Sequence, residues 1–221
     1  VVQRYSKPIM FIKLKDNDEV VDVLMEPYNE IFIATKKGYG LWYDRSEIPL
    51  IGLKTAGVKA INLKDDNVSS ACIFDGTFEY VTVITHKGLA KRIKLSEFEK
   101  TTRAKRGLLL LREVKSNPQE VIKVYVSDAK KMIMLVSDND TKQIKLTEIP
   151  IMDRYSAGST ITKKKIDNVY EIVNLTKDDV TDKKEVTKSV TKEDAKEKKE
   201  LSLKEIDDRF MTIDDFLDNF D

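Results

Sequence analysis

The stretch TKKGYGLWYDRSEIP, residues 35–49, decides the fold because it recurs along the chain. THKGLAKRIKLSEFE occupies residues 85–99, and a more diverged copy, SDNDTKQIKLTEIP, occupies residues 137–150. Each copy begins with a turn, continues as a short alternating strand, and ends in Ser or Thr followed by Glu. A period of about fifty residues is the signature of a repeat architecture, in which each repeat is one structural unit.

The turn of each copy keeps one position that suits a left-handed backbone. Gly38 aligns with Gly88 and then with Asn139. Because Gly and Asn tolerate positive φ better than other residues, the alignment predicts the same turn three times. A polar pair recurs with the same period: Ser46-Glu47, Ser96-Glu97 and Thr147-Glu148.

Each unit contains four β-rich runs, which predicts an all-β fold of propeller-like, four-stranded blades. Three full units lie near residues 18–67, 68–118 and 119–168, with partial units at both ends. A β-sandwich is the competing interpretation, but it gives no reason for the same turn chemistry in every unit. The runs of the first unit are Val20–Met25, Glu30–Thr35, Gly40–Asp44 and Val58–Leu63, and the later units end in Gly107–Val114 and Ser159–Lys164.

The charge of the chain is unevenly distributed, although its net value is only +1. Residues 176–221 carry 10 Lys+Arg and 15 Asp+Glu, whereas residues 1–175 carry 29 and 23. A basic body with an acidic tail favours a polyanion as the partner of the body.

Compartment and membrane signals are few. No apolar run approaches the roughly 18 residues that span a membrane. The N-terminus begins inside a repeat and shows no signal peptide. The single Cys, Cys72, stands in an apolar run, is predicted to be a small buried hydrophobe, and fits a reducing cytoplasm.

The composition changes from Thr176 onward, and this stretch predicts a solvated, disordered linker. The last 21 residues predict an acidic amphipathic helix, with a frayed tail as the alternative. We expect this tail to fold back on the body, or to dock on a partner, and to compete with DNA. The helical stripe consists of Ile206, Phe210, Ile213, Leu217 and Phe220.

The chain shows no catalytic motif. Its one His, His86, occupies a turn position where the first unit has Lys37. It has no Cys or His partner with which to form a metal site. Neither a Gly-x-Ser-x-Gly sequence nor a phosphate-binding Gly loop is present. We therefore expect no enzyme active site, no cofactor and no metal in this chain.

Positive charge recurs at matching positions of the units. Strand alternation places Ile93 and Leu95 on one face and Arg92 and Lys94 on the other. Stacked blades would line such side chains along a rim that suits duplex DNA, because each neutralised phosphate releases counterions. For any single Lys, ordinary solvated charge is the alternative. The candidate DNA-binding residues are Lys36, Lys37, Lys54, Lys59, Lys87, Lys91, Arg92, Lys94, Arg103, Lys105, Arg106, Lys142, Arg154, Lys163 and Lys164.

Two long segments carry a family resemblance: KKGYGLWYDRSEIPLIGLKTAGVKAINLKDDN (36–67) and KGLAKRIKLSEFEKTTRAKRGLLLLREVKSNP (87–118). They closely resemble the C-terminal domain of the A subunit of bacterial type IIA topoisomerases, nearer to topoisomerase IV than to gyrase. The resemblance covers roughly residues 1–175, which would form the domain, and leaves 176–221 as the tail. The Gly- and Arg-rich box of gyrase is not found; in the family it belongs to the first blade, and this chain begins later.

The resemblance implies a β-pinwheel, a propeller-like disc whose blades exchange strands, here as a partial disc. It implies a cytoplasmic, non-catalytic domain that binds and bends DNA on a basic perimeter and presents the transported segment for strand passage, decatenation and supercoil relaxation. The expected partners are duplex DNA, the rest of the A subunit, plus the ATPase B subunit, in a heterotetramer that uses ATP and Mg in its other domains. The alternative is a propeller-like protein-interaction scaffold that never binds nucleic acid.

Overall fold

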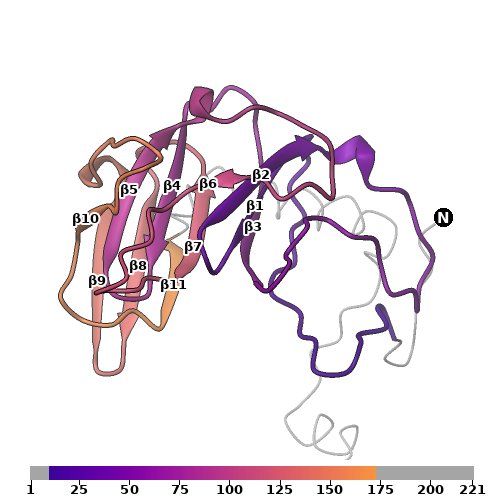
Figure 1. Cartoon of the computed structure of the whole chain (residues 1–221), viewed down its shortest axis with the longest axis horizontal. Helices are drawn as coiled ribbons and strands as arrows, with labels where there is room; N and C mark the ends of the chain where they lie inside the picture. Colours follow the sequence, from indigo (N-terminus) through magenta and orange to yellow (C-terminus); the bar gives the residue numbers. More distant parts are fainter. Residues whose placement is uncertain (1–9, 173–221) are drawn as a thin grey trace, which may run out of the picture. The chain divides into compact units, whose positions relative to one another are not determined.

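The structure is a computed structural model that describes residues 10–172. Its regular elements are antiparallel strands and three short 3-10 turns (Figure 1), which confirms the predicted all-β class. The strands are β1 (Glu30–Thr35), β2 (Tyr39–Asp44), β3 (Val68–Phe74), β4 (Tyr80–Thr85), β5 (Leu89–Lys94), β6 (Leu108–Leu109), β7 (Val121–Val126), β8 (Met132–Ser137), β9 (Asp140–Lys145), β10 (Ser159–Thr160) and β11 (Asn168–Ile172). The 3-10 turns are η1 (Arg45–Glu47), η2 (Leu95–Glu97) and η3 (Leu146–Glu148).

Neighbouring units exchange strands. The first sheet has the order β3-β1-β2-β6, the second β10-β5-β4-β7, and the third β11-β8-β9. Each sheet therefore takes its two hairpin strands from one unit and its flanking strands from the next unit along the chain (Figure 1). This arrangement confirms the expected pinwheel blades, and it means that no unit can complete its own sheet.

Strand exchange explains where the strand prediction was wrong. Val20–Met25 and Val58–Leu63 are not strands. Their counterparts in the next unit, β3 and β6, pair with β1 and β2 of the preceding unit. No preceding hairpin is among the described residues, so these two runs have no ladder to join, and backbone N–H and C=O groups form strands only by pairing.

The fourth strand of each unit is also much shorter than predicted. In Gly107–Val114 only β6 pairs, and Leu110 N then donates to the Gly38 carbonyl at 2.7 Å. Leu110 and Leu111 turn into the interior, where their exposed fractions are 0% and 4%. In this segment, burial of the two leucines between the sheets therefore replaces further strand pairing.

Two apolar cores join successive sheets. The first contains Phe32 and Phe74 of the first sheet together with Val81 and Val124 of the second. Phe32 meets Phe98 edge-to-face, with ring centroids 5.2 Å apart and an interplanar angle of 86°. A second core joins the second and third sheets through residues that include Ile84, Tyr125, Ile133, Leu135 and Ile144.

The turn glycines behave as predicted in two of the three hairpins. Gly38 and Gly88 have φ of +83° and +79°, whereas Asn139 is not among the described residues with positive φ, so that alignment was wrong. Gly107, with φ of +81°, has a packing role as well. A Cβ there would collide with the Gly40 carbonyl, across the β2–β6 pair.

The remaining predictions about chain organisation concern residues outside the described part. The chain divides into Val1–Val173 and Asn174–Asp221. The predicted domain limits, the disordered linker and the terminal helix stay predictions, since 173–221 lie outside the described residues. Within residues 10–172, no helix has the length and apolarity needed to cross a bilayer.

Candidate nucleic-acid interface

Each of the first two sheets is closed by the loop that precedes its fourth strand. We call residues 101–106 and 152–157 the latches. The backbone N–H of Arg103 donates to Glu47 Oε2 at 2.7 Å, and that of Arg154 donates to Glu97 Oε2 at 3.1 Å. Glu47 and Glu97 lie in η1 and η2, so the recurring Ser-Glu pair serves to hold the next unit. The sequence showed the recurrence of these Glu residues without their role.

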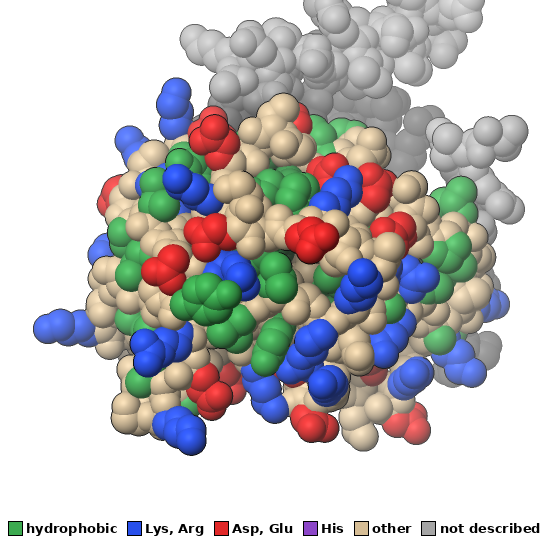
Figure 2. All heavy atoms as spheres, turned by 45° about the horizontal axis from the view of Figure 1, so that its top comes forward, with side chains coloured by type: hydrophobic (Ala, Val, Ile, Leu, Met, Phe, Trp, Pro, Cys, Tyr) green, Lys and Arg blue, Asp and Glu red, His purple; other side chains and the backbone are tan. Residues whose placement is uncertain are grey.

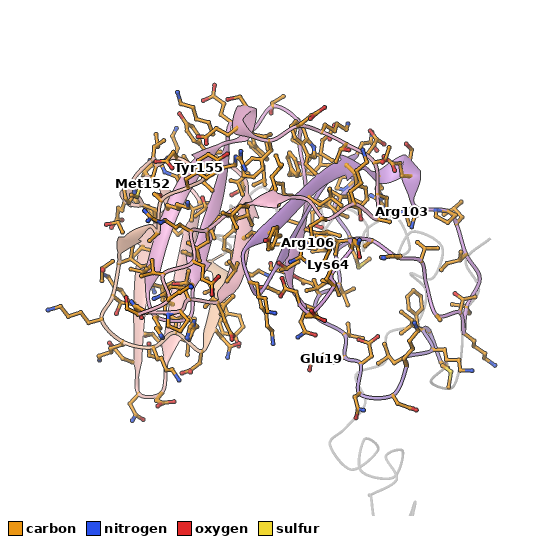
Figure 3. All side chains as sticks on the ribbon, viewed as in Figure 1. Glu19, Lys64, Arg103, Arg106, Met152 and Tyr155 are labelled. Carbon is orange, nitrogen blue, oxygen red and sulfur yellow. The ribbon has the colours of Figure 1, made fainter. Side chains whose placement is uncertain are left out.

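The candidate arginines are half-buried and bind backbone carbonyls. Arg103 Nε donates to the Glu47 carbonyl at 3.2 Å, and its Nη1 donates to the Lys59 carbonyl. Arg154 Nη1 donates to the Leu109 carbonyl at 3.2 Å. Figure 3 shows Arg103 and Tyr155 in the loops that carry the two latches.

The other two candidate arginines also hold neighbouring loops. Arg106 lies over the Tyr39 ring at 4.0 Å and donates to the Leu63 carbonyl, next to Lys64 (Figure 3). Arg92 donates through Nε to the Ile149 carbonyl at 2.7 Å and lies 5.3 Å from the Tyr80 ring centroid. The first role of these guanidinium groups is therefore to stabilise the contacts between units.

Lys91 is buried, so the prediction that its side chain lies on an exposed rim was wrong. Its side chain is fully buried, and Nζ donates to the carbonyls of Asp153, Arg154 and Ser156 at 2.8, 2.9 and 2.8 Å. Burial lowers the pKa of Lys91 to about 8. Strand alternation could have revealed this position, because residue 91 shares its face with Ile93.

A second set of candidates forms contacts at the hairpin tips, where Lys37 and Lys87 lie at a tip themselves and Lys164, which follows β10, reaches one. Lys37 Nζ donates to the Asp65 carbonyl, Lys87 Nζ donates to Asn117 Oδ1 at 3.1 Å, and Lys164 pairs with Asp140 at 2.8 Å. In each unit the tip of the hairpin thus contacts the segment that follows a fourth strand. Such exposed contacts leave the lysines largely in water and contribute little to stability.

The remaining candidates are exposed lysines. Three of them make a single side-chain hydrogen bond: Lys59 to Asn62, Lys105 to Thr101, and Lys142 to the Ile161 carbonyl. The other four make no side-chain hydrogen bond or ion pair within residues 10–172. These four, which we call the open lysines, are Lys36, Lys54, Lys94 and Lys163.

The structure does not gather the candidates into one cluster. They come from hairpin tips, third strands, latches and the segments after the fourth strands. On the face shown in Figure 2, Lys and Arg side chains alternate with Asp and Glu instead of forming an uninterrupted basic patch. Any binding along these positions must therefore be the sum of separate contacts, one or two for each unit.

One ionic contact between units was missed in the sequence. Lys100 Nζ contacts Glu30 at 2.7 Å and Asp44 at 3.0 Å, which joins the segment after η2 to the first sheet. Hydrogen bonds from Ser46, together with Lys100, lower the pKa of Asp44 to about 2. No sequence pattern marks Lys100, because its partners lie 70 and 56 residues away.

Successive antiparallel sheets that are built by strand exchange between units, and are latched one to the next, define a propeller-like repeat domain of the pinwheel type. The chain belongs to the family described as "DNA gyrase C-terminal domain, beta-propeller", which matches residues 2–25, 29–71 and 79–128, about half of the chain.

The curated relatives described here are A subunits of DNA topoisomerase 4. The A subunit of DNA topoisomerase 4 from Bacillus subtilis (strain 168) is 42% identical over 160 residues, which are 71% of this chain and 20% of the relative. The corresponding subunit of Staphylococcus epidermidis is 30% identical over 160 residues, 72% of this chain and 20% of the relative. The chain thus spans about a fifth of the length of these relatives.

Solved structures agree with the fold. The crystal structure of the C-terminal domain of DNA topoisomerase IV superposes with a TM-score of 0.74 and 37% identity, covering 85% of this chain and 60% of that one. The DNA gyrase A C-terminal domain gives a TM-score of 0.68 at 18% identity, with coverage of 75% and 58%, and supports the fold alone.

Proposed function

We propose that this chain is a non-catalytic DNA-binding and DNA-bending domain of a topoisomerase IV A subunit. In the parent enzyme it would present the transported duplex for strand passage, and so for decatenation and supercoil relaxation. The chain itself would use no cofactor, because ATP and Mg would act in other domains. Its protein partners would be the ATPase B subunit together with the rest of the A subunit.

The observation that carries the proposal is the repetition of the latch. Because each latch hydrogen-bonds to the preceding unit, one basic segment lies at the same edge of each completed sheet. Arg103 and Arg154 occupy matching positions in the two latches, and Lys54 lies in the corresponding loop of the first unit. A duplex that touches successive units meets a basic group in each of them.

Such contacts position DNA without reading its sequence. Phosphate contacts carry no base information. A duplex that follows several units must bend, and bending 20–30 base pairs smoothly by 40–90° costs on the order of 1–6 kcal/mol. The domain should therefore prefer DNA that is already curved or crossed, where part of this cost is already met.

Differences in exposure and hydrogen bonding favour some of the candidate residues over others as phosphate contacts. The candidate arginines already donate to carbonyls, so their replacement would damage the fold together with any DNA contact. The open lysines are exposed and make no side-chain bond within the described residues. We therefore assign the first contacts with phosphate to Lys36, Lys54, Lys94 and Lys163.

The test measures the affinity of the full chain for a duplex of about 30 base pairs against salt concentration. The logarithm of the binding constant should fall linearly with the logarithm of the salt concentration, with a slope of about −0.9 for each phosphate contact. Changing the four open lysines to Gln should make the slope shallower by roughly 3 to 4.

Lys130→Gln is the matched control, because Lys130 is exposed and lies in the turn between β7 and β8, beside the opposite edge of the second sheet. Its slope should equal that of the unmodified chain. A flat salt dependence of the unmodified chain would exclude DNA binding and favour the protein-interaction scaffold. Equal slopes for the fourfold variant and the control would exclude the open lysines as the contacts.

A further inference from the structure

Tyr155 is an exposed aromatic side chain in the latch that closes the second sheet, residues 152–157 (Figure 3). It is 62% exposed, and the residue at the matching position of the other latch is Ala104. A single exposed ring is ordinary on a protein surface. This ring is distinguished by the loop that carries it and by the charge that surrounds it.

Hydrogen bonds hold the backbone around Tyr155 in place. Lys91 Nζ donates to the carbonyls of Arg154 and Ser156, which flank the aromatic residue, at 2.9 and 2.8 Å. The Tyr155 N–H donates to Asp153 Oδ1 at 2.7 Å, and Ser156 Oγ donates to the Asp153 carbonyl at 3.0 Å. A loop that is already ordered loses less conformational entropy when it binds a partner. The ring is therefore presented on a preorganised loop.

Positive charge lies beside the ring. The Arg154 guanidinium lies 4.8 Å from the centroid of the Tyr155 ring, and its Nη2 donates to the Tyr155 hydroxyl at 3.0 Å. Arg112 is exposed, its backbone N–H donates to the Ser156 carbonyl at 3.3 Å, and its side chain makes no hydrogen bond or ion pair within residues 10–172. The one carboxylate of this latch, that of Asp153, already accepts the Tyr155 N–H. An aromatic ring next to guanidinium groups suits a ligand that combines planar rings with negative charge, and nucleic acid is such a ligand.

We propose that the Tyr155 ring enters bound DNA at an opened base step and stacks on the exposed base. Arg112 binds a phosphate beside that step, and Arg154 holds the ring and adds its charge. Many proteins that bend DNA insert an apolar side chain between base pairs, which kinks the duplex. This inference rests on the proposed function: the open lysines hold the DNA backbone, and Tyr155 marks the position at which the duplex bends most.

Insertion of the ring is easiest where base stacking is already weak. A mismatched base costs less to unstack than a paired one. A duplex with one mismatch therefore offers the ring a site, whereas a fully paired duplex must first be opened. Because a mismatch also makes DNA more flexible, the informative quantity is how the preference for the mismatched duplex changes when the ring is removed.

The test compares the affinity of the full chain for the duplex described above and for the same duplex with one central T·T mismatch. The ratio of the two affinities should be lower in Tyr155→Ala than in the unmodified chain by roughly 5- to 100-fold, the contribution of stacking one base on an aromatic ring. Tyr155→Phe keeps the ring and should keep the ratio. Tyr170→Ala is the matched control, because Tyr170 is 52% exposed and lies on β11, and its ratio should equal that of the unmodified chain.

The outcomes separate this inference from the proposed function. A flat salt dependence of the unmodified chain removes DNA binding and this inference with it. A normal salt slope, together with equal ratios in Tyr155→Ala and Tyr170→Ala, overturns this inference alone. So does a loss in Tyr155→Phe as large as that in Tyr155→Ala, which would assign the effect to the hydroxyl and its bond with Arg154. Self-association of the unmodified chain that Tyr155→Ala abolishes would assign the ring to a second copy of the chain, and would also overturn it.

Discussion

At the residue scale, one position shows how a repeat assigns different tasks to equivalent residues. Leu41, Lys91 and Lys142 match one another in β2, β5 and β9. Leu41 packs in the apolar cluster of the first sheet, whereas Lys91 satisfies three carbonyls of the latch. A buried ammonium is tolerated only when its donors are satisfied, and here all three are.

Lys91→Leu should lower the free energy of unfolding by about 1–3 kcal/mol at pH 7, because it leaves the latch carbonyls without a donor. The folded-state pKa of Lys91, about 8, lies below its unfolded value of 10.5. From about pH 8 to 10.5 the unfolded chain binds the extra proton, so this group adds stability as the pH rises. Urea denaturation at pH 7 and pH 9.5 should therefore show a wider gap between the two proteins at the higher pH; a narrower gap would contradict this account.

Gly107→Ala should destabilise the domain for two reasons that act together. The φ of +81° strains an L-residue, and the new methyl group collides with the Gly40 carbonyl. We expect a loss of about 2 kcal/mol or more. Gly52→Ala is the control, since Gly52 has open space around its Cα, and its thermal midpoint should barely move.

At the element scale, the sequence predicted the hairpins and not their partners. β1 and β2, and β4 and β5, follow directly from alternation and from Gly38 and Gly88. The exchange of flanking strands came from the family resemblance, because pairing between residues that lie 33 to 71 positions apart leaves no local pattern. Val20–Met25 has the propensity of a strand, and it is not one because no hairpin stands beside it among the described residues.

The candidate site was predictable to a similar degree. Repeat alignment found the basic positions, but it could not distinguish an exposed lysine such as Lys94 from a buried one such as Lys91. The roles of Glu47 and Glu97 also required the structure, since each accepts a bond from a residue 56 or 57 positions away.

The latch itself leads to a prediction at this scale. Glu97→Ala should destabilise the domain by about 1.5–3 kcal/mol, because the N–H of Arg154 loses a charged acceptor. Glu99→Ala is the control, since Glu99 is exposed and its side chain makes no hydrogen bond within the described part. Guanidinium denaturation checks both variants, and equal midpoints would show that the latch contributes nothing.

At the scale of the whole molecule, sheets that are built by strand exchange between units and that share apolar cores should unfold together. A linear repeat protein gains its stability from contacts between neighbours, so cooperativity depends on those contacts. The first core combines residues of the first and second sheets, such as Phe32, with Phe98, which directly follows η2. Trp42, the only Trp in the chain, lies in β2 beside this core, and its Nε1 donates to Glu30 Oε2 at 2.7 Å. Its fluorescence therefore reports on the first sheet, whereas far-UV circular dichroism reports on all sheets.

In the unmodified chain the two signals should give coincident urea transitions. Phe98→Ala removes a ring that is 5% exposed and should cost about 3–5 kcal/mol, mostly at the junction between the first two sheets. The Trp42 transition should then move to lower urea than the circular dichroism transition, because the first sheet loses its neighbour while the second core stays intact. Ile149→Ala, in the second core, is the matched comparison. In this variant the Trp42 transition should coincide with the part of the circular dichroism signal that is lost at higher urea. Coincident transitions in both variants would mean that the described part unfolds as one body even without these contacts, and the nearest-neighbour account would be wrong.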